Sequence, residues 1–468
     1  MTKKIIALLL AATLITTSLT GCGSSASKAD DEKNVASGTT TLAKSESTPA
    51  GEKKEITLWF WGVANGYDEH FRKVVEEMYN STQEEYKLTI EFRNTVDNDV
   101  PVALAAGSGP DIVYSSGPSF AAVYALENKI LPLDSYAEQY GWKDKMPSVL
   151  YNACTLNGKL YSIPSTISFD GIFYSKSLFK EKGWEVPKTI DDLEKIFSEA
   201  STAGIYPSAI GNKGWRPNND TFASIMVNHF ASPSLLYDGL TGKEKFDNPE
   251  LQSAVAKTKD WYDKGYIGGK DYTNLNSLEW FQLLSEKRAA IVFAQSKFFQ
   301  HASASFTGDL QDDLGFAPMP SAYPTEMPVY NLEIPCTFAI NAASKYPDEC
   351  AKIMDLFFNE DFMMKMTQVW PGHWAGAIKD RTANTDELTG IGKMYMDAVK
   401  EASKSIDSGY YGFNASTFFP PKTAEKWRDI DMVWQGVLTP EEYLQEIDKT
   451  IKEEIAAKLV CPLAKPVV

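Results

Sequence analysis

A segment with apolar side chains on both faces is the strongest constraint on how this chain can fold. The run ITLWFWG carries Ile56, Leu58 and Phe60 on one face and tryptophans 59 and 61 on the other. Such a strand is stable only inside a sheet that is covered on both sides. An amphipathic helical pattern and a second apolar run at 86–92 follow. This order predicts an α/β fold with covered sheets.

The stretch 157–193 has the densest local signals. Asn157-Gly158 between apolar residues predicts a tight hairpin, and a short strand is expected at 172–174. A helix then ends near Gly183. Thr189 and Asp192 stand at capping-box spacing, so a second helix is expected to begin there.

Further patterns follow along the chain. LAAGSGPDIVY, from Leu104, predicts the end of a helix followed by a buried strand. YNLEIPCTFAINAAS, from Tyr330, precedes another helix. WQGVLTPEEYLQEI places Thr439, Pro440 and Glu442 in a capping box with proline at the first helical position.

Taken in order over residues 55–460, these patterns resemble the family 1 extracellular solute-binding proteins, the group that includes the maltose-binding protein. The resemblance implies a two-lobed fold like that of periplasmic binding proteins, each lobe being a sheet covered by helices. It implies hinge segments near 165–170 and 316–322. The expected division is 55–166 with 322–370 for lobe 1, and 167–321 with 371–468 for lobe 2.

The first 54 residues are expected to lie outside this fold. Lys3 and Lys4, a short apolar run and the sequence Leu19-Thr20-Gly21-Cys22 predict a lipoprotein signal over 1–22, with lipid attached to Cys22. Residues 23–54 are small or polar and predict a disordered tether. A lipid-anchored protein on the outer face of a Gram-positive cell membrane is therefore expected, with the membrane reached only through the anchor.

Composition excludes several functions. The 468 residues have a formal net charge of -16, which argues against nucleic acid because no basic stripe is present. The cysteines lie too far apart for a paired metal motif, and the four histidines form no HExxH. Free thiols, no metal and no cofactor are expected.

Candidate ligand-binding residues follow predicted strands or lie in crossing segments, because ligands of open α/β sheets bind beyond the carboxyl ends of strands. Aromatic rings suit the apolar faces of sugars, and amides and carboxylates suit their hydroxyls. The candidates are Trp61, Asn65, Ser116, Phe120, Ser168, Asp170, Asn212, Trp215, Gln295, Phe298, Asn331, Glu333, Trp370, His373 and Trp374. A further aromatic wall at 410–413 is also possible.

The resemblance implies a monomeric receptor that binds a mono- or oligosaccharide between its lobes and delivers it to the permease of an ABC importer. Two alternatives stay open. One is a non-sugar solute such as glycerol phosphate or a peptide, and a phosphate would use cations such as Lys213 and Arg216. A surface glycoside hydrolase would need two carboxylates flanking the scissile bond.

Overall fold

A computed structural model describes residues 53–63, 66–216, 218–375, 377–379 and 385–468. The chain from Lys53 to Val468 is one compact unit. The predicted signal, lipidated cysteine and tether up to residue 52 lie outside the described residues. Within the described part, no helix is both long and apolar enough to cross a membrane.

The first sheet contains five strands, four from the chain before residue 165 and one from residues 337–340. Its strands, in spatial order, are β2 (Tyr86–Arg93), β1 (Lys54–Trp61), β3 (Ile112–Ser115), β12 (Thr337–Ile340) and β6 (Ile163–Pro164). β1 is parallel to β2 and β3, whereas β12 is antiparallel to β3 and β6. Ile56, Leu58 and Phe60 are fully buried, as the apolar run predicted.

The second sheet is arranged around one central strand. Its strands, in spatial order, are β13 (Tyr411–Phe413), β11 (Tyr330–Glu333), β7 (Ser168–Ser175), β9 (Ala289–Gln295) and β8 (Tyr206–Ser208), with β10 (Leu314–Ala317) also paired to β7. β7 runs antiparallel to β9, β10 and β11. β8 is parallel to β9, and β13 is parallel to β11. The two sheets confirm the α/β prediction.

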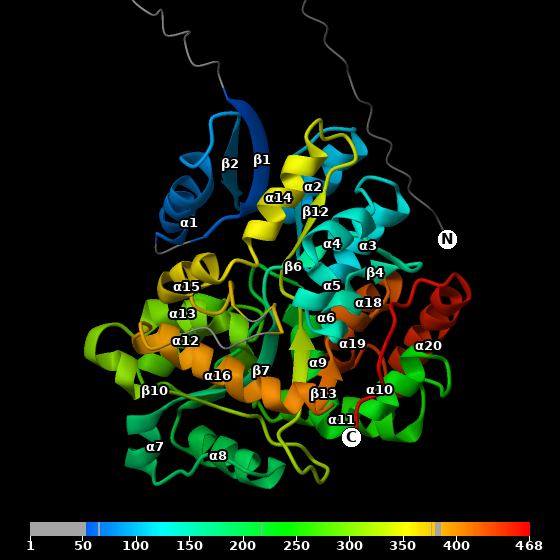
Figure 1. The fold of residues 1–468 in the computed structure, drawn as a ribbon. Coiled ribbons are helices and arrows are strands. Elements are labelled where there is room, and N and C mark those ends of the chain that lie inside the picture. The colour runs from blue at the N-terminus through cyan, green and yellow to red at the C-terminus, as the bar shows by residue number, and fades with distance from the viewer. Residues whose placement is uncertain (1–52, 64–65, 217, 376, 380–384) are drawn as a thin grey trace, which may run out of the picture. The chain divides into compact units, whose positions relative to one another are not determined.

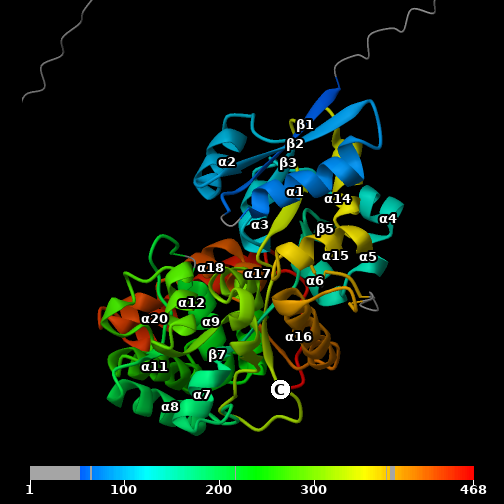
Figure 2. The ribbon, with the colours of Figure 1, turned by 90° about the vertical axis from the view of Figure 1, so that its left-hand side faces the viewer.

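Helices cover both sheets (Figures 1 and 2). In chain order the helices are α1 (Tyr67–Val75), η1 (Glu76–Asn80), α2 (Val96–Ala105), α3 (Pro118–Leu126), α4 (Asp134–Tyr140), α5 (Trp142–Lys145), α6 (Ser148–Ala153), α7 (Lys176–Lys182), α8 (Ile190–Thr202), α9 (Asn218–Phe230), α10 (Pro233–Leu240), α11 (Pro249–Asp263), η2 (Gly269–Asp271), α12 (Ser277–Ser285), η3 (Ser296–Phe298), α13 (Phe299–Ser305), η4 (Gly308–Asp313), α14 (Pro347–Leu356), α15 (Glu360–Val369), α16 (Gly390–Asp407), α17 (Ala415–Phe418), α18 (Pro421–Trp427), α19 (Ile430–Trp434) and α20 (Pro440–Ala456). Helices α1, α2, α3 and α14 contact the first sheet, whereas α7, α8, α9 and α12 contact the second.

The local predictions for 157–193 are confirmed. The hairpin joins β4 (Thr155–Leu156) to β5 (Lys159–Leu160), and Asn157 and Gly158 both have positive φ, 51° and 76°. Such a two-residue turn matches the twist of the strands. Gly183 ends α7 with φ 69°. Reciprocal capping boxes start α8 at Thr189 and α20 at Thr439.

The chain passes between the two sheets at 165–167, from β6 to β7, at 334–336, from β11 to β12, and again in the long segment between β12 and β13. The first crossing falls within the predicted hinge at 165–170. The predicted hinge at 316–322 does not coincide with a passage between the sheets, because β10 and β11, the strands on either side of it, both belong to the second sheet. For the same reason β11 lies outside lobe 1, although the expected range of that lobe begins at 322. The division into lobes otherwise remains a prediction.

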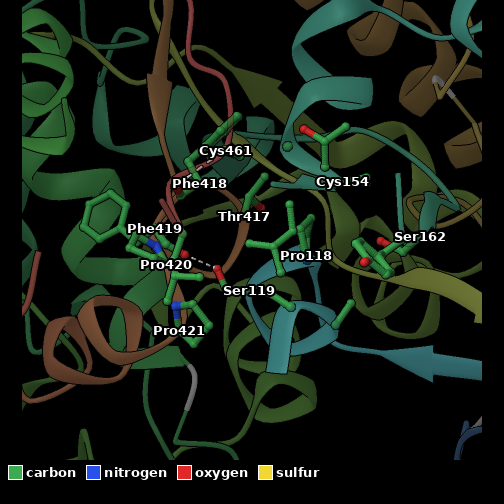
Figure 3. Close-up of a pocket in the computed structure, with 17 residues that line it drawn as sticks. Pro118, Ser119, Cys154, Ser162, Thr417, Phe418, Phe419, Pro420, Pro421 and Cys461 are labelled. Atoms are coloured by element: carbon green, nitrogen blue, oxygen red, sulfur yellow. Dashed lines mark hydrogen bonds between the residues drawn. The ribbon is translucent and has the colours of Figure 1, made fainter. Parts of the chain in front are cut away.

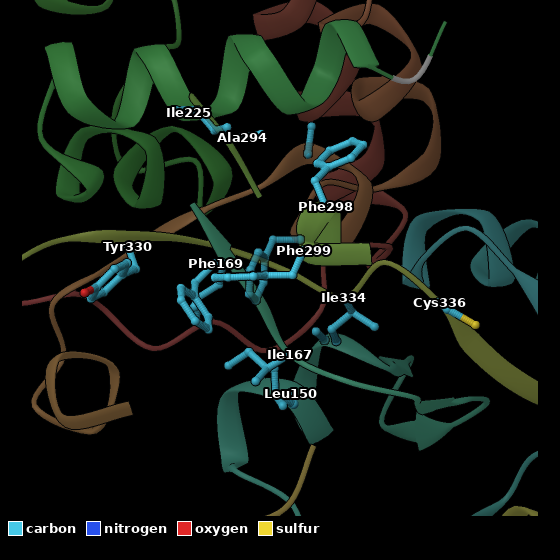
Figure 4. Packing of buried hydrophobic residues seen from close by; sticks show 14 of the residues in the cluster. Leu150, Ile167, Phe169, Ile225, Ala294, Phe298, Phe299, Tyr330, Ile334 and Cys336 are labelled. Atoms are coloured by element: carbon cyan, nitrogen blue, oxygen red, sulfur yellow. The ribbon is translucent and has the colours of Figure 1, made fainter. Parts of the chain in front are cut away.

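Apolar packing continues through the crossings. Figure 4 shows Ile167 and Ile334 of the crossing segments on one side of Phe169, and Tyr330 on its other side. The Phe169 and Tyr330 rings meet edge to face at 5.4 Å, and all four residues are at most 3% exposed. The crossings are therefore packed and not loosely connected.

Candidate functional site

A cavity of about 300 Å³ opens between the strand ends of the two sheets. Its volume is at the lower end of the range of small-molecule sites, roughly 300–1,000 Å³. The lining residues come from both sheets and their loops: Trp61, Gly62, Asn94, Asp97, Tyr114, Ser116, Lys213, Trp215, Asn218, Ser277, Lys297, Phe298, Gln300, His301, Pro335 and His373.

Strand direction explains why these residues meet. β1, β2 and β3 are parallel, so Trp61, Asn94 and Ser116 all follow carboxyl ends at one edge of the first sheet. In the second sheet β8, β9 and β11 point the same way. The loops after β8 and β9 therefore bring Trp215 and Phe298 to one edge.

Aromatic rings form the apolar part of the cavity. Trp61 and Trp215 are half-buried, whereas Phe298 and His373 are 4% and 2% exposed. The imidazole of His373 stacks on Trp370 at 5.1 Å and meets the Trp61 ring at 5.5 Å. Trp61 and Trp215 belong to opposite sheets, so a ligand between them could touch both lobes.

Buried polar atoms in the lining lack partners. Asn218 Oδ1, His301 Nδ1 and His373 Nε2 make no hydrogen bond to any described residue. A buried polar atom without a partner costs roughly 1–3 kcal/mol. Hydroxyl groups of a ligand could satisfy all three, because hydroxyls both donate and accept.

The charged groups of the lining are held by other side chains. Lys297 donates to Glu333 Oε1 at 2.7 Å, and its ammonium lies 4.6 Å from the centre of the Trp215 ring. Ser116 donates to Asp97 Oδ1 at 2.6 Å. The Asp97 carboxyl is exposed to the cavity, but loss of bulk water around it raises its pKa, and the Ser116 hydrogen bond opposes this rise.

Both cavity histidines are neutral near pH 7. Burial, with a smaller contribution from the nearby Lys297 charge, lowers the pKa of His301 to about 4. The same two causes lower the pKa of His373 to about 3. The cavity therefore carries little net charge.

The structure brings together five of the predicted site residues in the cavity lining, namely Trp61, Ser116, Trp215, Phe298 and His373. Asn65 lies outside the described residues. The remaining candidates do not line the cavity: Phe120, Ser168, Asp170, Asn212, Gln295, Asn331, Glu333, Trp370 and Trp374. That any of the fifteen binds ligand remains a prediction.

Several of these remaining candidates support lining residues instead. Ser168 accepts from the backbone N–H of Lys297 at 2.9 Å. Trp370 donates to Gln300 Oε1 at 2.7 Å. Trp374 instead packs in the apolar core beside the first sheet, where its ring lies 4.7 Å from the Phe71 ring. This burial follows from the large apolar area of an indole, which position at a strand end does not reveal.

Sequence reasoning missed several lining residues. Asn94, directly after β2, obeyed the strand-end rule and could have been found by it. Asp97, Asn218, Gln300 and His301 lie on helices. Only tertiary packing brings those helices to the cavity.

A second cavity, shown in Figure 3, is too small for a sugar. Its volume of about 30 Å³ suits one or two waters. Cys154 and Cys461 line it as free thiols. The other described cysteines, Cys336 and Cys350, are buried free thiols, as expected. Among the described residues no group of His, Cys, Asp or Glu is arranged to hold a metal ion.

The histidines predict how stability depends on pH. Their pKa values in the folded protein, about 4 and about 3, lie below the ordinary histidine pKa of 6.5, so protonation favours the unfolded chain. The contribution of these two histidines to the free energy of unfolding should be fully present above pH 6.5. It should fall as the pH drops from 6.5 towards 4, by about 1.4 kcal/mol per pH unit for each histidine. Urea unfolding at several pH values measures this slope.

Two variants check the cause of that slope. His373→Gln should flatten it by about the contribution of one histidine. His70→Gln should leave it unchanged, because His70 lies outside the cavity lining and its ring bonds the Lys365 carbonyl. Equal slopes in wild type and His373→Gln would contradict the assignment.

Comparisons with known proteins agree with this architecture. The chain is 27% identical over 201 residues to the alpha-glucosides-binding periplasmic protein AglE of Rhizobium meliloti, covering 40% of this chain and 42% of that protein. It is 24% identical over 272 residues to the maltooligosaccharide ABC transporter solute-binding lipoprotein of Streptococcus pneumoniae, covering 55% and 59%. The matches thus span about two fifths to three fifths of these relatives.

Solved structures share the fold. A protein from a study of xylan utilisation by the thermophilic bacterium Caldanaerobius polysaccharolyticus superposes with a TM-score of 0.72, at 20% identity, over 85% of this chain and 100% of that one. A chitin oligosaccharide binding protein gives 0.71, at 20% identity, over 87% and 100%.

The family model described as bacterial extracellular solute-binding protein matches residues 65–364. The match spans well over half of the chain and includes strands from both sheets. The chain therefore belongs to the bacterial extracellular solute-binding proteins, the transport family that its sequence resembles.

Proposed function

We propose that this protein is a lipid-anchored receptor that captures a carbohydrate in the cavity between its two sheets and delivers it to an ABC importer. The observation that carries the proposal is the composition of the cavity. Aromatic rings from both sheets face it together with buried polar atoms that have no described partner. This combination suits a sugar, which has apolar C–H faces and a rim of hydroxyls.

The charges argue against an anionic solute. A phosphate would require free cations, yet Lys297 is paired with Glu333 at 2.7 Å and Lys213 with Glu279 at 3.4 Å. Arg216 is paired with Asp429. Asp97 would also repel a phosphate.

The same lining argues against glycoside hydrolysis. Asp97 is the one carboxylate among the described lining residues. Hydrolysis of a glycosidic bond uses two carboxyl groups on either side of that bond. A receptor role needs no second carboxylate.

The relatives support the same proposal. One is named for binding alpha-glucosides and another is a maltooligosaccharide-binding lipoprotein. By this analogy the sugar is handed to permease subunits on the outer face of the membrane. Ligand that touches both sheets would favour a closed state by its higher affinity for that state.

A thermal-shift screen of mono- and oligosaccharides tests the function. A true ligand at 100 times its dissociation constant should add about 2.7 kcal/mol to the free energy of unfolding and raise the melting midpoint. Glycerol phosphate and peptides serve as the competing solutes. A shift with one of these and with no sugar would replace the carbohydrate assignment, and turnover of an oligosaccharide would replace the receptor assignment.

Trp215 provides the sharpest test of the site. Trp215→Ala should weaken sugar binding by about 1–3 kcal/mol, or roughly 5- to 150-fold, because a ring contact and its buried area are lost. The stability should change less than the ~3–5 kcal/mol of a core tryptophan deletion. Calorimetric titration and urea unfolding measure the two quantities.

Trp184→Ala is the matched control. Trp184 is also half-buried, but its indole bonds Glu199 at 2.7 Å and does not line the cavity. This variant should bind sugar normally. A Trp215→Ala protein that loses stability but binds normally would mean that Trp215 is only a packing residue.

The anchor is tested at Cys22. Cys22→Ala should abolish lipid attachment while leaving sugar binding unchanged, because every described residue of the cavity lining lies after Lys53. Metabolic labelling with a fatty acid measures attachment. Continued labelling of the variant would contradict the proposed lipid site, and loss of binding would contradict the tether.

A further inference from the structure

A chain of hydrogen bonds between β7 of the second sheet and helix α9 has no role in the proposed receptor function. His229 Nε2 lies 2.6 Å from Asp170 Oδ2, and His229 Nδ1 lies 3.0 Å from Ser321 Oγ. His229 and Asp170 are fully buried, whereas Ser321 is half-buried. A serine, a histidine and an aspartate therefore lie in line, and only the serine reaches solvent.

The proton positions follow from the partners. Asp170 Oδ1 accepts from the backbone N–H of Asn331 at 2.6 Å, so both carboxylate oxygens face donors. Nε2 faces a carboxylate oxygen, so it carries a hydrogen and donates to Asp170. In the tautomer with its hydrogen on Nε2, the lone pair of Nδ1 faces Ser321 and accepts from its hydroxyl. The histidine is thus oriented as a general base for the serine.

The backbone holds the serine rigidly against this base. The N–H of Ala322 donates to the carbonyl of His229 at 2.8 Å. The Tyr323 hydroxyl donates to the carbonyl of Asn228 at 2.6 Å. Three consecutive residues of the loop after β10 are therefore attached to the last turn of α9, and a fixed nucleophile–base distance favours reaction.

Ser321 opens onto a groove that is separate from the ligand cavity. The groove has a volume of about 860 Å³ and runs between the segments 186–191 and 318–329. It shares no lining residue with the sugar cavity. Pro318, Tyr323 and Ile190 contribute apolar surface to the groove, which suits an uncharged acyl chain.

We propose that Ser321 is a base-activated nucleophile that accepts an acyl group from a small carboxylic ester bound in this groove. Ser321 Oγ attacks the ester carbonyl while its proton passes to His229 Nδ1. The ester C–O bond breaks, the leaving alkoxide takes that proton, and an acyl–Oγ bond remains. Asp170 acts as a positioning residue that fixes the imidazole, and no oxidant or cofactor is needed.

The test uses the full-length protein, an alkyl fluorophosphonate probe and p-nitrophenyl acetate. The modified residue is identified by peptide mass spectrometry, and rates are compared with those of Ser253. That serine is exposed, and its hydroxyl donates to the Pro249 carbonyl of its own helix. Ser321 should react at least about 100-fold faster, the lower end of what a positioned general base contributes.

Two further measurements identify the base. His229→Gln should reduce the reaction rate at Ser321 to that at Ser253. If this variant does not fold, the wild type unfolded in urea replaces it, and its rate at Ser321 should likewise fall to that at Ser253. Ser321→Ala should lose the adduct and keep its sugar-induced thermal shift, which separates this proposal from the receptor function. Equal rates at Ser321 and Ser253 in the folded protein, or a fast rate that survives His229→Gln, would overturn it.

Discussion

The pairing of β7 with β11 is the constraint on which the rest of this structure depends. β7 begins directly after the first crossing and β11 ends directly before the second, and the two strands pair at Phe169–Leu332 and Ser168–Glu333. The chain is thereby held at its first two passages between the sheets. The same pairing places Glu333 beside Lys297, which lines the cavity, so the crossings and the site share one set of contacts.

The cavity is polar but carries few free charges. Lys297 is neutralised by Glu333 and both lining histidines are uncharged near pH 7. Burying an unpaired charge would cost far more than burying an amide or a neutral imidazole. This balance makes the site suited to a neutral ligand with many hydroxyls, and unsuited to one that brings its own charge.

Helix α9, which packs on the second sheet, contains another polar region with different chemistry. Helix α9 is buried along its length, yet it carries Asp220, Asn228 and His229 on its buried surface. Burial raises the pKa of Asp220 to about 6, although Arg428 lies 3.3 Å away and opposes the rise. Such groups are stable inside a protein only when other side chains satisfy them, so α9 is fixed by polar contacts as well as by apolar packing.

Local chemistry was sufficient to predict the elements of the fold. The apolar run of β1, the Asn157-Gly158 turn and the capping boxes at Thr189 and Thr439 each act within a few residues, and each is confirmed. The order of these elements also indicated the family. The second crossing was misplaced at 316–322 because strand membership depends on long-range pairing, which no local pattern encodes.

The candidate site was predictable only in part. The strand-end rule located Trp61, Trp215 and Phe298, because the direction of a strand determines the edge at which its last residues emerge. It could not distinguish these rings from Trp374, since every indole gains free energy by burial and only the tertiary structure decides which one the core encloses. The sequence by itself therefore determined the fold class and the edge where ligand chemistry gathers. The packing of the helices against the two sheets decided which side chains line the cavity.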